Sequence, residues 1–107
     1  MQYFDHDGQE LGFLEWAIRM NDDKYVCMEC DTVGEFTVST VWTGLDLNHH
    51  PTKKILIFET MLFEDGEPLD CVKWETKELA VAGHKRTVEE LTKLGFSAIH
   101  TYDKNNH

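Results

Sequence analysis

The sequence predicts an α+β fold, in which an antiparallel sheet of four to five strands is covered by a short N-terminal helix and a longer C-terminal helix. Two observations support this prediction. Short extended segments alternate with turn signals, while two segments have apolar residues at helical spacing, in the order β, α, three or four β, α. With 107 residues, 41% of them apolar, the chain is expected to form one domain over residues 1–107.

The N-terminal half is predicted to contain three strands and a short helix. Phe13 and Ile18 lie on one face of that helix, which ends at polar residues. Asp5-His6-Asp7-Gly8 is expected to be a turn, because the later acidic ligands of a calcium loop are missing. A second turn is expected at residues 32–34. The strands are expected at residues 2–5, 25–30 and 35–42, and the helix is expected at residues 13–20.

The C-terminal half is predicted to contain the central strand and the long helix. Residues 55–63 are the most apolar run, which predicts a strand buried on both faces. A hairpin signal at residues 64–68 leads to a strand at 70–74. Thr76 is the expected N-cap of a helix that stops at Gly95, and the following segment is either a last strand or coil.

Acidic residues are concentrated in the first third of the chain. The formal net charge is −10, and residues 1–37 hold nine acidic and two basic residues, which leaves −7. Such a surface repels phosphate backbones and attracts basic proteins, so we expect no direct binding to nucleic acid. The alternative is that the charge only keeps the protein soluble. The residues expected to bind a basic partner are Asp5, Asp7, Glu10, Glu15, Asp22, Asp23, Glu29 and Asp31.

The sequence predicts a cytoplasmic protein that does not enter a membrane. It contains no run of about 18 apolar residues, and its N-terminus lacks the basic and apolar regions of a signal peptide. Three cysteines cannot all pair within one chain, so reduced thiols are expected.

Glu59 is the residue on which the predicted site depends. In a strand at 55–63 it would share a face with apolar residues, and a carboxylate buried there needs a partner, a metal ion or a proton. His84 is expected to face it, because His84 lies four residues from both Ala80 and Val88 on the apolar face of the long helix.

Three loop residues extend this pair to a candidate metal site. Asp46, His49 and His50 precede the central strand. Together with the Glu59 carboxylate and the His84 imidazole, they would offer the ligands that Zn²⁺ or another divalent transition metal uses. The alternative is a buried Glu–His ion pair, or a hydrogen-bonded core histidine, without any metal.

The remaining motifs give weaker signals. Cys27-Met28-Glu29-Cys30 has the spacing of half a zinc site, but a second half of that kind is absent from the sequence. On a regular strand, positions i and i+3 project to opposite faces, so ordinary packing of these thiols is expected unless the chain turns there. No catalytic residues are expected, because the sequence has no phosphate-binding glycine loop, nucleophile elbow or nucleophile paired with a base.

Three segments carry a resemblance to known proteins. Residues 38–46 (VSTVWTGLD), 57–63 (IFETMLF) and 82–84 (AGH) resemble a group of short, mostly uncharacterised proteins encoded by phages and prophages. The resemblance implies a small phage protein, and acidic phage proteins of this size include inhibitors of host defence such as anti-CRISPR proteins. Glu59, His84 and Asp46 lie inside the shared pattern, whereas the cysteine pair and the His49-His50 doublet depart from it.

The sequence therefore predicts a phage-encoded interaction protein rather than an enzyme. Its partner would be a host defence protein, such as a CRISPR effector nuclease, bound through a basic surface in the host cytoplasm. A structural Zn²⁺ or other divalent metal would stabilise the fold. The alternatives are a small metal-dependent hydrolase that uses Glu59 and His84, and a virion or housekeeping component.

Overall fold

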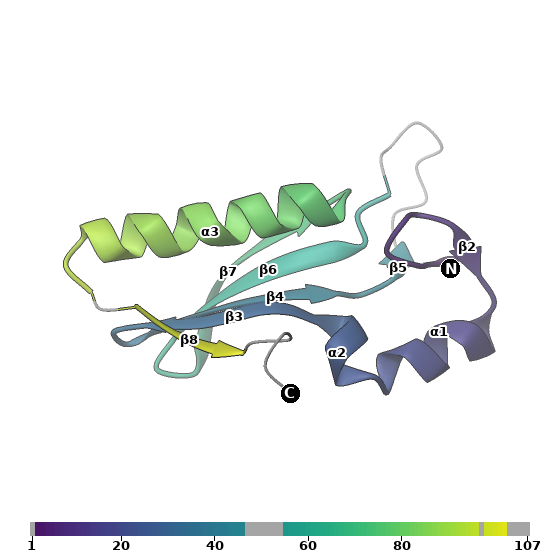
Figure 1. The fold of residues 1–107 in the computed structure, drawn as a ribbon, viewed down its shortest axis with the longest axis horizontal. Helices are drawn as coiled ribbons and strands as arrows, with labels where there is room; N and C mark the ends of the chain where they lie inside the picture. Colours follow the sequence, from purple (N-terminus) through teal and green to yellow (C-terminus); the bar gives the residue numbers. More distant parts are fainter. Residues whose placement is uncertain (1, 47–54, 97, 103–107) are drawn as a thin grey trace.

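The computed structural model describes residues 2–46, 55–96 and 98–102. Its elements form two antiparallel sheets and three helices (Figure 1), which confirms the predicted α+β class. In chain order they are β1 (Gln2–Phe4), β2 (Glu10–Leu11), α1 (Phe13–Met20), α2 (Asp23–Val26), β3 (Cys27–Val33), β4 (Phe36–Trp42), β5 (Leu45–Asp46), β6 (Phe58–Glu64), β7 (Glu67–Trp74), α3 (Lys77–Lys93) and β8 (Ala98–Tyr102).

The larger sheet has the strand order β7-β6-β4-β3-β8, and all its neighbours are antiparallel. The register places Thr40 of β4 opposite Thr60 of β6, so the buried faces of the two strands coincide. The prediction that the central strand is buried on both faces is wrong. Phe58 and Thr60 are buried, whereas Glu59 and Met61 are partly exposed, because α3 packs on only one face of the sheet.

α3 lies along one face of the larger sheet and contacts β3, β4, β6 and β7 (Figure 1). As predicted, Thr76 is its N-cap: the side-chain oxygen accepts a hydrogen bond from the amide of Leu79 at 3.2 Å. Gly83 allows close contact with β7, because a Cβ at this position would lie 2.2 Å from a ring carbon of Trp74. The helix is therefore pressed against the sheet at the residue before His84.

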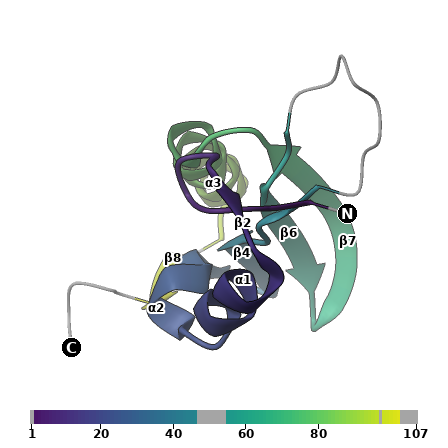
Figure 2. The same cartoon turned by 90° about the vertical axis from the view of Figure 1, so that its right-hand side faces the viewer.

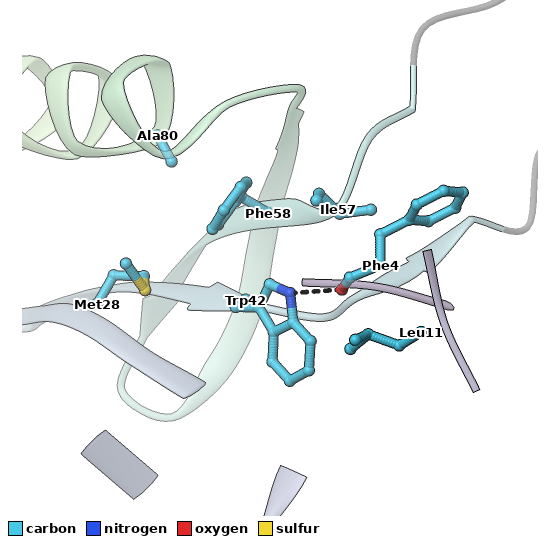
Figure 3. Packing of buried hydrophobic residues seen from close by; sticks show 7 residues of the cluster. All are labelled: Phe4, Leu11, Met28, Trp42, Ile57, Phe58 and Ala80. Atoms are coloured by element: carbon cyan, nitrogen blue, oxygen red, sulfur yellow. Dashed lines mark hydrogen bonds between the residues drawn. The ribbon is translucent and has the colours of Figure 1, made fainter. Parts of the chain in front are cut away.

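The smaller sheet has the order β2-β1-β5 and joins the larger one through a shared core. Trp42 at the end of β4 is fully buried, and its indole N–H donates to the carbonyl of Phe4 in β1 at 3.0 Å (Figure 3). Gly44 has φ of +65°, and a Cβ there would lie 2.4 Å from the Trp42 ring. The cluster is formed by Phe4, Leu11, Met28, Trp42, Ile57, Phe58 and Ala80.

α1 and α2 lie together at one end of the molecule, away from α3 (Figure 2). α1 has the predicted bounds, and Trp16 fixes it by donating a hydrogen bond to the carbonyl of Thr43 at 2.9 Å. The prediction of a strand from residue 25 is wrong at its start. The Asp22 carboxylate accepts from the amide of Lys24 at 3.1 Å and caps a helical turn, so the strand begins only at Cys27.

Candidate functional site

Five polar side chains form a continuous hydrogen-bonded chain beneath α3. The Asp31 carboxylate of β3 lies 2.5 Å from Nε2 of His84 on α3. Nδ1 of the same imidazole lies 2.7 Å from Oγ1 of Thr40, which is 2.6 Å from Oγ1 of Thr60. The indole N–H of Trp74 donates to Thr60 at 3.0 Å. This polar chain of hydrogen-bonded side chains thus links α3 to β3, β4, β6 and β7.

The Trp74 indole fixes the direction of one hydrogen bond in this polar chain, because its N–H can only donate and Thr60 accepts from it. A hydroxyl group can both donate and accept, so either threonine can be the donor in the bond between Thr40 and Thr60. The roles of the two His84 ring nitrogens follow from the tautomer of the ring. Each of the five side chains has a hydrogen-bond partner within the polar chain, as buried polar groups require.

Burial makes this polar chain important for stability. His84 is 1% exposed and Thr40 is fully buried. A buried polar group without a partner costs about 1–3 kcal/mol, and more if it is charged. Loss of any member would remove a hydrogen bond from each of its neighbours inside the protein, so the polar chain fixes the position of α3 on the sheet.

A cavity of about 300 Å³ opens beside the acidic end of the polar chain. It is lined by Asp31 and His84 together with Glu29, Lys85, Val88 and Glu89. Thr40 is fully buried and does not line it, so the hydroxyl next to the imidazole is shielded from solvent by α3. The geometry suits a structural anchor better than a nucleophile activated by histidine, which needs an accessible hydroxyl.

The expected contact between Glu59 and His84 is wrong. Thr60, which follows Glu59 on β6, bonds to the polar chain under α3, and alternation therefore turns Glu59 to the opposite face. There Glu59 lies opposite Lys73 of β7 and is partly exposed. Partial burial and the nearby Glu59 carboxylate raise the pKa of the Cys71 thiol. The buried acid that faces His84 is Asp31.

The other predicted metal ligands do not join this site in the described part of the chain. Asp46 belongs to β5 of the smaller sheet, opposite Gln2. Within residues 2–46, 55–96 and 98–102, no group of three or more His, Cys, Asp or Glu side chains is placed to hold a metal ion. His49 and His50 lie outside the described residues. Binding of Zn²⁺ stays a prediction.

The predicted acidic surface is largely present. Asp5 and Glu29 are partly exposed, and the Asp5 carboxylate also accepts hydrogen bonds from the amides of Asp7 and Gln9, both at 2.9 Å. Asp31 is the exception to the prediction, because it is buried against His84 and its carboxylate cannot serve as an exposed contact. The exposed members of the set are Asp7, Glu10, Glu15, Asp22 and Asp23.

α1 carries an exposed apolar surface, and acidic residues lie near it along the sequence. Phe13, Leu14 and Ile18 are 57%, 73% and 71% exposed, and we call these three residues the α1 surface. None of the eight residues of α1, all of which the structure describes, is buried. The single basic residue of the helix, Arg19, lies over the ring of Tyr25, 5.5 Å from its centroid. The α1 surface is therefore apolar and exposed, with Glu10, Glu15, Asp22 and Asp23 before, within and after it in the sequence.

The sequence interpretation missed Thr40 and Thr60 as members of a site. Both lie two residues from buried apolar residues, and therefore on the same face of their strand. Thr40 lies between Val38 and Trp42, and Thr60 follows Phe58 by two residues. A hydroxyl at such a position on two adjacent strands is a usable signal, because each hydroxyl needs a buried partner.

Comparisons with protein-family models, with curated proteins and with solved structures gave no match for this chain. Among the residues that the structure describes, no helix combines the length and the apolar composition needed to cross a bilayer. The function must therefore be inferred from the surfaces and side chains of this chain itself.

Proposed function

We propose that this chain is an interaction protein that docks through α1 onto a basic protein surface containing an apolar groove. The observation that carries the proposal is the exposure of Phe13, Leu14 and Ile18 at 57%, 73% and 71%. A contiguous exposed apolar patch with a polar rim is typical of a protein-binding site. An amphipathic helix that enters a partner's groove presents such residues at positions i and i+4, as Leu14 and Ile18 do.

Charge complementarity selects the partner. Glu10 and Glu15 flank the α1 surface at its start, and Asp22 and Asp23 follow its end. A second copy of the chain would bring carboxylates against carboxylates, and each copy has a formal net charge of −10. A partner with Lys and Arg around its groove satisfies both the apolar surface and the acidic residues near it.

The phage resemblance supports a more specific form of the proposal, in which the partner is a host defence protein such as a CRISPR effector nuclease. Basic grooves of such enzymes hold phosphate backbones. An acidic helix seated in that groove would occupy the same Lys and Arg residues and exclude the nucleic acid. The proposed activity is therefore competitive inhibition in the host cytoplasm.

The test uses a Leu14→Gln/Ile18→Gln variant and a matched control, Leu79→Gln/Leu94→Gln, which changes two exposed leucines of α3 or its C-cap. Binding to a panel of purified effector–guide complexes is measured between about 50 and 300 mM salt. We expect the α1 variant to lose at least about tenfold in affinity, the control to bind normally, and affinity to fall with salt.

Two results would contradict different parts of the proposal. If no effector binds at low salt, the inhibitor role is rejected. The docking surface is tested separately by NMR titration with a synthetic amphipathic helix of Leu and Lys residues. If the peptide leaves the amide resonances of α1 unchanged, the α1 surface is not a docking site for basic partners.

A further inference from the structure

A β-bulge brings the two thiols of the Cys27-Met28-Glu29-Cys30 segment onto one face of the larger sheet. Cys27 lies opposite Val41, whereas Cys30 lies opposite Ser39. Three steps along β3 therefore match two steps along β4, with the register shift between Cys27 and Glu29. On a regular strand these cysteines would project to opposite faces, but the bulge makes β3 irregular here and places them on the same face.

The residues inside the bulge confirm its geometry. Glu29 lies opposite Thr40, whose side chain faces α3, and Met28 is 2% exposed within the core cluster. Both residues of the bulge thus turn toward the α3 side. Cys27 and Cys30 are left as partly exposed neighbours on the other face, and neither forms a disulfide.

The spacing of the two thiols suits a bridging ion better than a disulfide. Two strand steps correspond to about 6.6 Å between Cα atoms, close to the upper limit of about 6.8 Å for disulfides. A disulfide joins the two sulfur atoms by one bond, whereas a bridging ion joins them by two metal–sulfur bonds. The ion therefore spans a longer distance between the two cysteines. The pair can therefore be bridged without moving the backbone of β3.

We propose that Cys27 and Cys30 form a binding site for a soft monovalent metal ion of the Cu(I) class. Soft thiolates select such ions, and two thiolates satisfy Cu(I). A structural Zn²⁺ site needs four ligands. In the described ranges no third His, Cys, Asp or Glu joins the pair to make a metal-binding group. This inference is independent of the docking proposal, because the cysteines lie outside the α1 surface.

Binding leaves the oxidation state of the ion and of the sulfurs unchanged. Two S–H bonds are lost, two sulfur–metal bonds form, and two protons pass to solvent. Thiols bind metal ions as thiolates, so the metal must displace the protons and binding strengthens as the pH rises. The Asp23 carboxylate also attracts a cation to the site.

The experiment is an anaerobic titration of the reduced protein with Cu(I) in competition with a colorimetric Cu(I) chelator. We expect one equivalent to bind to the wild type and to the Cys71→Ser control. Cys30→Ser should lose at least about 90% of the bound metal, and Cu(I) should protect Cys27 and Cys30, but not Cys71, from alkylation. Circular dichroism checks that each variant is folded.

A relocation variant separates the bulge geometry from the number of thiols. Glu29→Cys/Cys30→Ser retains three cysteines, but it moves the second thiol to the α3 side of the sheet, so we expect metal binding to be lost. Full binding by this variant or by Cys30→Ser would overturn the proposal. A wild-type protein that leaves all Cu(I) with an equimolar amount of the chelator would overturn it as well.

Discussion

The two longer helices treat their apolar faces in opposite ways. α1 exposes Leu14 and Ile18, although most of its eight residues are apolar, as is typical of buried helices. α3 buries Gly83 and the polar His84 together with Ala80 and Leu91. The difference lies in what faces each helix: α3 has a sheet with matching hydrogen-bond partners, whereas α1 contacts β1 and α2, and its Trp16 bonds to the carbonyl of Thr43.

This difference predicts where the protein tolerates change. At the α3 interface, directional hydrogen bonds and a close helix approach leave little freedom, so polar changes there should lower stability. On α1 the exposed apolar residues contribute little to folding, because their surface stays in water. Substitutions there should instead alter binding. Substitutions at the two helices test this contrast.

His84→Ala should lower the free energy of unfolding by about 3–5 kcal/mol, because it removes the imidazole that bonds to the buried Asp31 carboxylate. Urea unfolding measures the loss. Arg86→Ala on the exposed side of the same helix is the control and should change stability by less than about 0.5 kcal/mol. Equal stability of the two variants would show that the polar chain does not hold α3.

Thr40→Val removes one hydroxyl with little change of shape. It should cost about 1–3 kcal/mol, because Nδ1 of His84 and the hydroxyl of Thr60 both lose a partner. The control is Thr37→Val, three residues earlier on the opposite face of β4 and partly exposed, with an expected change below about 0.5 kcal/mol. A neutral Thr40→Val would show that water or another group replaces the hydroxyl.

Gly83→Ala tests the close approach of α3 to β7. Alanine should gain about 1 kcal/mol in helix propensity, but overpacking against Trp74 costs about 1–3 kcal/mol, so we expect a net loss of about 1 kcal/mol. The Trp74 indole should also change its fluorescence. A stabilised variant with unchanged fluorescence would mean that the ring has room to move.

The local elements were predictable because their signals lie within a few residues. Thr76 and Gly95 bracket α3 in the sequence as they do in the structure, and α1 begins and ends where its pattern does. The helical turn before β3 was missed, because Asp22 acts as a cap that overrides the extended pattern of Tyr25 and Val26. Such competition between a cap and a strand pattern is decided by tertiary packing.

The candidate site was predicted only in part. His84 was correctly placed on the buried face of α3, but its acidic partner depends on which face of the sheet the helix covers. Alternation shows that Glu59 and Thr60 point opposite ways, yet it does not show which of them is inside. Strand pairing decides this, and the bulge in β3 that aligns Cys27 with Cys30 also depends on it. Neither has a local sequence signal.

Leu14→Gln/Ile18→Gln is the variant with the smallest expected effect on folding. Both side chains are more than two-thirds exposed, so replacing them should change the free energy of unfolding by less than about 1 kcal/mol. In contrast, Trp16→Ala on the same helix should cost more, because its ring packs against Tyr3 and its N–H bonds to Thr43. Urea unfolding of the two variants compares an exposed and an anchored side of one helix. If the glutamine variant unfolds as readily as Trp16→Ala, the exposed leucine and isoleucine belong to the folding core after all, and α1 is not a surface reserved for a partner.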